Sequence, residues 1–167
     1  RYNAGYVHLK SGRFAHALPP PGREHAEREA AGRSLLPFVL WMRADLLTKL
    51  GKFDEAAATQ RPGLAIDEQD LGPEHPDVAF DLQVLADIDE SRDDVAGAER
   101  YLRRALLIAE RALGPGDTYV GDLHLALAEL FAHAGRGEEA LAQAQRGPGG
   151  NHELLGNLRA GARLFDD

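Results

Sequence analysis

The sequence contains no cysteine, one tryptophan and one methionine. The lack of cysteine excludes disulfide bonds and thiolate metal sites, and it leaves the cellular compartment open. No apolar run is long enough to span a bilayer, and the N-terminus has no signal-like segment. Acidic residues outnumber basic residues by 27 to 19, which gives a formal net charge of −8. A broad nucleic-acid-binding surface is therefore not expected.

The 167 residues that are present have the composition of an ordinary folded protein, with 44% hydrophobic and 28% charged residues. This length suits one globular domain or a short helical array. Because the chain begins at Arg1 and not at Met, we expect it to be a piece or a processed product of a longer protein. We expect a cytoplasmic location, and an extracellular one stays open.

The sequence repeats itself with a period of 42 residues. Leu71-Gly72-Pro73 returns as Leu113-Gly114-Pro115, and Leu155-Gly156 follows after the same interval. A fixed period of this size is typical of repeat arrays, in which each unit buries its apolar face against its neighbours. We therefore interpret the whole chain in terms of this repeating unit.

The most regular unit, residues 73–114, predicts two antiparallel helices joined by a short turn. Pro76 and Asp77 suit the start of the first helix, called here the A helix. Apolar residues then fall on one helical face, namely Val78, Leu82, Leu85 and Ala86. A polar break at 91–94 ends this pattern, and a second apolar stripe predicts the B helix. Gly114-Pro115 is a combination that ends a helix.

A shift of 42 residues in either direction keeps the small residues in register, so that Ala86 maps to Ala44 and Ala128. We therefore predict an all-α protein, a solenoid of antiparallel helix pairs with about 3.5–4 repeats. A single array occupies residues 1–167. Its predicted units are a partial one at 1–32, full units at 33–72, 73–114 and 115–156, and a half-unit or cap at 157–167.

The helix pairs resemble the tetratricopeptide repeat family, in the long-repeat variety found in kinesin light chains. The matching features are the Leu-Ala pair of the A helix, the turn glycine, the small residue early in the B helix, and the Leu-Gly-Pro-Glu-His-Pro loop. They are found at Leu85-Ala86, Leu127-Ala128, Gly12, Gly51, Gly135, Ala17, Ala56, Ala98, Ala140 and residues 71–76. HEAT-type repeats have a similar period, but the small residues favour the tetratricopeptide interpretation. The resemblance implies a right-handed superhelix whose A helices line its concave surface.

The sequence departs from the family pattern in two ways. Arg43 occupies the position of Leu85 and Leu127, where an apolar residue is expected. Prolines also interrupt the predicted B helices, and a proline inside a helix costs about 3 kcal/mol. We predict a kink near Pro62 and breaks near Pro20 and Pro148.

Carboxylates recur at one position of the A helix, at Asp45, Asp87 and Glu129. Large apolar or amide side chains lie on the same predicted face. The full set of predicted ligand-binding residues is Phe38, Trp41, Asp45, Phe80, Gln83, Asp87, Glu90, Leu125 and Glu129. Such a groove would attract a basic or amphipathic peptide. The alternatives are a solvated acidic face and, for Trp41, packing between helices.

Other kinds of site find little support in the sequence. The clamp for peptide carboxylates that the family uses needs Asn on the A helices, and the matching faces offer only Gln83 and Lys49. The seven histidines lack the spacings of a metal site, so no metal or other cofactor is expected. No nucleophile motif or phosphate loop is present either. We therefore expect a protein that is not an enzyme.

These observations predict a non-catalytic scaffold that binds a protein or peptide segment, without nucleic-acid or membrane partners. Two alternatives stay open. The terminal units could stack end to end and give a homo-oligomer or fibre, because residues 157–165 form half a unit that the partial unit at 1–17 could complement. The array could also be the regulatory part of a larger multidomain protein.

Overall fold

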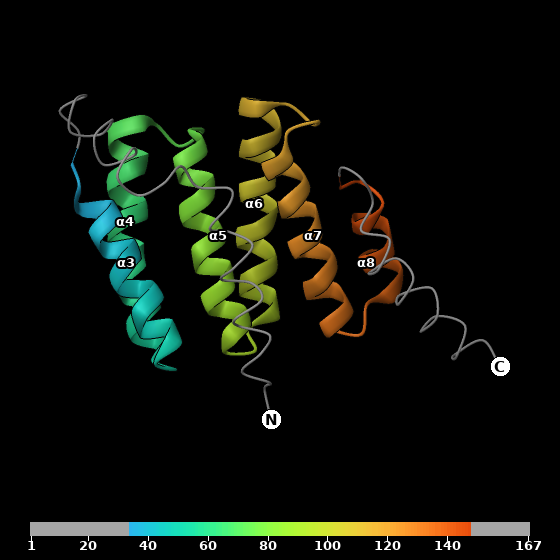
Figure 1. Ribbon diagram of the computed structural model, residues 1–167, viewed down its shortest axis with the longest axis horizontal. Helices are drawn as coiled ribbons and strands as arrows, with labels where there is room; N and C mark the ends of the chain where they lie inside the picture. The colour runs from blue at the N-terminus through green and yellow to red at the C-terminus, as the bar shows by residue number, and fades with distance from the viewer. Residues whose placement is uncertain (1–33, 148–167) are drawn as a thin grey trace.

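The computed structural model describes residues 34–147, which form six α-helices and no strand. Figure 1 shows them as a row of rods. The helices are α3 (Leu36–Lys49), α4 (Phe53–Leu71), α5 (Pro76–Ser91), α6 (Val95–Leu113), α7 (Thr118–His133) and α8 (Gly137–Ala144). Each helix packs mainly against the helices before and after it in the chain. The predicted all-α solenoid of helix pairs is confirmed.

The 42-residue period is visible in the helix boundaries. The B helices α4, α6 and α8 begin at Phe53, Val95 and Gly137, each 42 residues after the last. The predictions for the partial unit before residue 34, the break near Pro20 and the half-unit at 157–167 concern residues outside the described part of the chain. The break near Pro148 also falls outside it, and α8 has already ended at Ala144.

The Leu-Gly-Pro motif ends each long B helix and leads into the next A helix. Gly72 and Gly114 both have φ of 88°, which is a conformation that other residues rarely adopt. The next helix is then started by a side-chain cap. The Nδ1 atom of His75 accepts a hydrogen bond from the Asp77 amide at 3.2 Å, and the equivalent Asp117 carboxylate accepts one from the Tyr119 amide at 2.8 Å. The loop therefore sets the repeat frame.

Helix α4 runs without interruption through Pro62 and Gly63 and has 19 residues, as many as α6. A Cβ atom at Gly63 would lie 3.6 Å from the Cβ of Leu40 and from the Cα of Pro37, so α4 approaches α3 closely here. Packing against α3 therefore keeps this segment helical in spite of Pro62.

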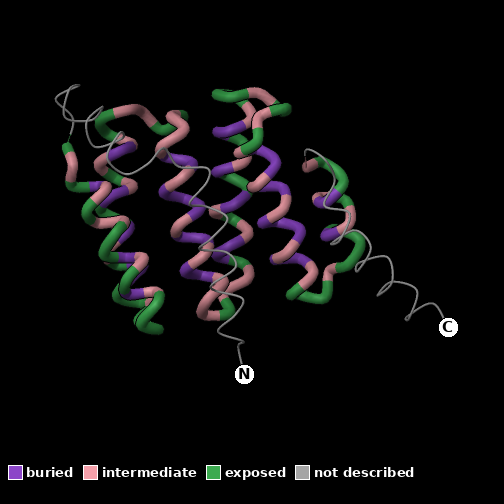
Figure 2. The backbone as a smooth tube through the Cα atoms, viewed as in Figure 1, coloured by how far each residue is buried: buried purple, intermediate pink, exposed green. Residues whose placement is uncertain are grey.

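Buried residues occur on all six helices (Figure 2). Their side chains form an interior that continues from one helix pair to the next. One cluster joins α5, α6, α7 and α8 around Leu82, Leu102 and Phe131. A second joins α3 and α4 to α5 through Leu85 and Ile88. Each fully buried leucine contributes about 1.5–3 kcal/mol. Apolar burial within each helix pair and between neighbouring pairs is therefore the main source of stability.

Ion pairs on the surface also join residues about one repeat apart: three of them link neighbouring units, and Arg111–Glu74 joins the two ends of the unit 73–114. Four arginines bind carboxylates that lie 36 to 38 residues earlier in the sequence. These pairs are Arg92–Asp54, Arg104–Glu68, Arg111–Glu74 and Arg136–Glu99. Because exposed ion pairs contribute only about 0–1 kcal/mol each, they fix the register of the stack more than they stabilise it.

Candidate functional site

The three recurring carboxylates lie on the three A helices, Asp45 on α3, Asp87 on α5 and Glu129 on α7, and we call them the acidic ladder. All three side chains are half-buried. Asp45 accepts a hydrogen bond from the Lys49 ammonium at 2.5 Å within its own helix. The ladder therefore combines partial exposure with regular spacing along the array.

Three aromatic side chains meet between α3 and α5, next to Asp45 and Asp87 of the acidic ladder. The ring centroid of Trp41 lies 5.6 Å from that of Phe38 and 5.7 Å from that of Phe80. Both distances fall in the range of favourable aromatic pairs. All three residues are half-buried, so Trp41 packs between the helices and also keeps part of its surface exposed. We call these residues the aromatic cluster.

The position of Trp41 is occupied by Gln83 in α5 and by Leu125 in α7. The three side chains differ in how far they are buried. Leu125 is half-buried, as Trp41 is, whereas Gln83 is only 2% exposed. Neither polar atom of the Gln83 carboxamide has a hydrogen-bond partner among the described residues. The remaining predicted residue, Glu90, is half-buried near the end of α5. The predicted set therefore does not present one uniform surface.

Tyr119, at the start of α7, was not among the predicted site residues. Its hydroxyl is buried and has no hydrogen-bond partner among residues 34–147. Burial raises the pKa of this phenol far above its usual range, and the nearby carboxylates, first among them Asp87 and Asp81, raise it further. Tyr119 therefore remains a protonated hydroxyl at the α5–α7 boundary, within the electrostatic reach of the acidic ladder.

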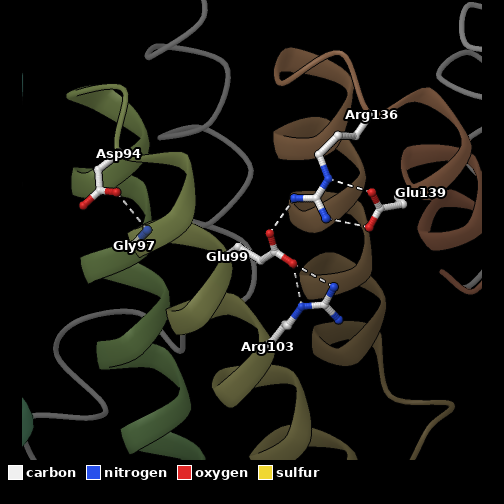
Figure 3. A network of polar contacts seen from close by, with 6 residues as sticks. All are labelled: Asp94, Gly97, Glu99, Arg103, Arg136 and Glu139. Atoms are coloured by element: carbon white, nitrogen blue, oxygen red, sulfur yellow. Dashed lines mark hydrogen bonds and ion pairs between the residues drawn. The ribbon is translucent and has the colours of Figure 1, made fainter.

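A polar network joins α6 to the turn between α7 and α8 (Figure 3). The Glu99 carboxylate accepts hydrogen bonds from Arg136 at 2.5 Å and from the Arg103 Nε at 2.8 Å. Arg136 also pairs with Glu139 through two bonds, at 2.5 and 2.6 Å. The guanidinium of Arg136 lies 4.2 Å from the ring centroid of Phe131. The network therefore links α6 to the α7–α8 turn and to the start of α8.

Comparison with known proteins identifies the repeat. A family model described as tetratricopeptide repeat matches residues 37–106, from α3 into α6. These residues belong to the tetratricopeptide repeat family. The resemblance seen in the sequence is thus confirmed, and the family suggests a protein–protein interaction scaffold. Tetratricopeptide repeat proteins are generally non-catalytic.

Solved structures show the same tetratricopeptide-like architecture. The crystal structure of BtubC (BKLC) from P. vanneervenii superposes with a TM-score of 0.69. The two proteins share 22% sequence identity, over 95% of this chain and 70% of that chain. Among the curated proteins, none matches the chain in sequence.

No three His, Asp or Glu side chains within residues 34–147 are grouped as a metal site would require. None of the helices in this range is both long and apolar enough to cross a membrane.

The Glu99 network predicts a pH-dependent contribution to the stability of the array. Hydrogen bonds from Arg136 and Arg103 hold the pKa of Glu99 below its usual range. A carboxyl group with a lowered folded-state pKa stabilises the fold above its unfolded pKa of about 4.3, and this contribution is lost as the pH falls through the folded value. We expect Glu99→Gln to lower the free energy of unfolding by about 1 kcal/mol at neutral pH. In urea unfolding curves, the difference from the wild type should shrink below about pH 4.

Glu138→Gln is the matched control for this experiment, because Glu138 is exposed and lies close to the same turn. It should leave stability within about 0.5 kcal/mol of the wild type at every pH. A loss in Glu99→Gln that stays constant from neutral to acidic pH would show that the ionised carboxylate is not the stabilising form.

Proposed function

We propose that the array binds a basic or amphipathic segment of a protein partner along the face formed by its A helices. The observation that carries this proposal is the acidic ladder. The same position of three successive A helices holds a carboxylate, and all three side chains remain partly exposed. A solvated face would not need the same charge at each repeat. In the tetratricopeptide family this face is the concave one, where a ligand can contact several repeats at once.

Electrostatics would act mainly on the arrival and orientation of the partner. The chain has a net charge of −8, so a segment rich in Lys or Arg is attracted to it from a distance. Partly exposed carboxylates contribute modestly to affinity, and salt weakens their effect. Because the carboxylates of the acidic ladder lie one repeat apart, they favour an extended ligand with several cationic side chains.

The aromatic cluster would supply the apolar anchor of the site. Trp41 contacts both Phe38 on its own helix and Phe80 on the next A helix. Aromatic side chains that are fixed by packing and remain partly exposed are common centres of binding energy. Because these rings are held in place before the ligand arrives, binding loses little conformational entropy. The ligand is therefore expected to place an apolar residue at the α3–α5 boundary and basic residues along the ladder.

The test is a charge reversal at two residues of the acidic ladder, Asp45→Lys combined with Asp87→Lys. The probes are synthetic peptides that alternate Lys or Arg with Leu or Phe, together with acidic peptides of the same apolar content. We expect the basic set to bind the wild type and the double variant to lose at least about tenfold in affinity. Trp41 is the only tryptophan, so its fluorescence reports directly on binding beside the cluster.

Asp70→Lys with Glu138→Lys is the matched control, since it changes the net charge equally at exposed positions on the B helices α4 and α8. It should retain most of the affinity. Equal losses in the two double variants would mean that net charge alone attracts the peptide, and the assignment of the groove would then fail. Equal binding of basic and acidic peptides would refute the proposed ligand class.

A further inference from the structure

Two neighbouring A helices, α5 and α7, hold buried polar groups that form no hydrogen bond among the described residues. Among them are the Tyr119 hydroxyl and both polar atoms of the Gln83 carboxamide. Gln83 is 2% exposed and lies one turn before Asp87, on the side of α5 that carries the acidic ladder. Buried polar groups without a hydrogen bond are rare and costly in folded proteins. These groups therefore offer unused donors and acceptors to a ligand that reaches them.

The charge around these groups is negative. Helix α5 carries five Asp and Glu residues and α7 carries two, and neither helix contains Lys or Arg. Besides burial, which is the main cause, four of these carboxylates raise the pKa of the Tyr119 phenol. They are Asp87, Asp81, Asp122 and Asp77. They thus lie close enough to act on a charge beside the hydroxyl, where a cation would be stabilised and an anion repelled.

We infer, resting on the proposed function, that the α5–α7 boundary binds one lysine side chain of the partner segment and that Tyr119 and Gln83 select it. This lysine is the ligand residue that the acidic ladder receives at Asp87. Its ammonium group has three N–H donors. The Tyr119 oxygen and the Gln83 carbonyl are uncharged acceptors for them, and Asp87 supplies a charged one. The negative surroundings offset the cost of removing the ammonium group from water.

The uncharged acceptors favour lysine over arginine. A guanidinium group is a planar fork that binds a carboxylate best through two bonds at once, as Arg136 does with Glu139. Tyr119 and Gln83 each offer a single oxygen atom, and therefore suit the compact charge of an ammonium group. The slender four-carbon stem of lysine also reaches more easily past the half-buried carboxylates to groups that lie below the surface.

The aromatic cluster sets the distance between this lysine and the apolar residue of the ligand. The cluster joins α3 to α5, and Tyr119 on α7 lies one repeat further along the array. Neighbouring helices pack about 10 Å apart, and an extended peptide covers about 3.3 Å per residue. The lysine is therefore expected about three residues from the apolar residue.

The probes are short peptides built on a background of serine. The lysine peptide, Ser-Lys-Ser-Ser-Leu-Ser-Ser-Lys-Ser, has one lysine on either side of its leucine at the expected spacing, so it serves both chain directions. The arginine peptide replaces both lysines by arginine, and the shifted peptide places them next to the leucine. Binding to the full chain is followed by the fluorescence of Trp41, the only tryptophan. We expect the wild type to bind the lysine peptide at least about fivefold more tightly than the other two.

Tyr119→Phe removes only the hydroxyl group and is the decisive variant. It should weaken binding of the lysine peptide at least about fivefold and leave that of the arginine peptide within about twofold of the wild type. Gln83→Leu, which introduces the residue that α7 has at this position, should have the same effect. Both variants should unfold in urea at the midpoint of the wild type or above it, because each removes buried polar atoms that form no hydrogen bond. A merely structural role of either residue would lower the midpoint.

Tyr101→Phe is the matched control, since Tyr101 lies on the B helix α6 and also loses only a hydroxyl group. It should bind all three peptides as the wild type does. Tyr119→Phe and Gln83→Leu keep the acidic ladder intact, so a loss confined to the lysine peptide cannot come from a change in net charge. The charge reversal of the acidic ladder, by contrast, should weaken the binding of every basic peptide.

If Tyr119→Phe binds the lysine peptide as the wild type does, or loses the same factor for all three peptides, the hydroxyl does not select lysine and its assignment is wrong. An unchanged preference in Gln83→Leu would overturn the role of Gln83. Equal affinity of the wild type for the lysine and arginine peptides would overturn the choice of lysine. In all these cases basic peptides still bind and the proposed function stands, whereas a wild type that binds none of them would refute both.

Discussion

Gly97→Ala is expected to lower the free energy of unfolding by about 2–3 kcal/mol, although alanine is normally the better helix former. Gly97 lies in the first turn of α6, where an added Cβ atom would be 2.2 Å from Oδ2 of Asp89 and 2.6 Å from Oδ2 of Asp94. Neither carboxylate can move freely. Asp89 is buried and pairs with Arg92 at 2.9 Å, and Asp94 accepts a hydrogen bond from the Gly97 amide at 2.9 Å. The methyl group therefore has to displace a buried ion pair or a helix cap.

Gly137→Ala is the matched control, because Gly137 begins the last B helix and an added Cβ atom there meets no atom within 4 Å. It should be neutral or slightly stabilising in urea unfolding followed by circular dichroism. The double variant Asp89→Leu with Gly97→Ala should recover most of the loss. The preceding repeat combines Leu47 with Glu55 at these two positions, so a leucine there tolerates a Cβ atom at the second position. A neutral Gly97→Ala would show that the two carboxylates are less constrained than their contacts indicate.

Asp89 and Gly97 also show where prediction from the sequence ends. The positions equivalent to Asp89 hold the buried residues Leu47 and Phe131, so the repeat pattern predicts an apolar side chain there. Burial raises the pKa of Asp89, and the charge of Arg92 opposes that shift. Gly97 on α6 has no side chain that would collide with the buried carboxylate of Asp89 on α5, so the two residues compensate for each other. This compensation could not be recognised without the distance between them.

The helix pairs themselves could be predicted, because they depend on local signals that recur every 42 residues. The helix start at Pro76 and Asp77, the glycines that end the B helices, and the apolar face of each helix can all be recognised from the local sequence. The continuity of α4 through Pro62 could not, since it depends on the packing of Gly63 against α3. Tertiary contacts outweighed the local preference there.

The candidate site was predictable to a smaller extent. Helical spacing placed Phe38, Trp41 and Phe80 near one another, and their rings do meet between α3 and α5. Spacing alone could not show that Gln83 is buried, because burial depends on the neighbouring helices. Tyr119 escaped notice for a similar reason. Its only signal in the sequence is that it takes the repeat position of Asp77, and its approach to the carboxylates of α5 depends on how the two A helices are packed.

The second large effect is a gain in stability, expected from Pro62→Ala. Pro62 is exposed in the middle of α4, where it cannot donate a backbone hydrogen bond to the carbonyl of Ala58. Removing a proline from a helix interior is worth up to about 3 kcal/mol. The greater conformational freedom of the unfolded chain without this proline reduces the gain by about 0.4–1 kcal/mol. We expect a net gain of about 2 kcal/mol, which corresponds to a rise in Tm of about 4–8 °C for a protein of this size.

The matched control for Pro62→Ala is Pro115→Ala, at an exposed loop position after α6, which should change stability in the opposite direction by less than about 1 kcal/mol. Pro62→Arg is a second test, since the equivalent residue of α6 is Arg104 and both helices have 19 residues. Hydrogen exchange should show the gain as slower exchange along α4 and at its contacts with α3. If Pro62→Ala left the unfolding midpoint unchanged, α4 would already bend at Pro62 in a way that relieves the proline. A bend of this kind is the kink that the sequence predicts near Pro62.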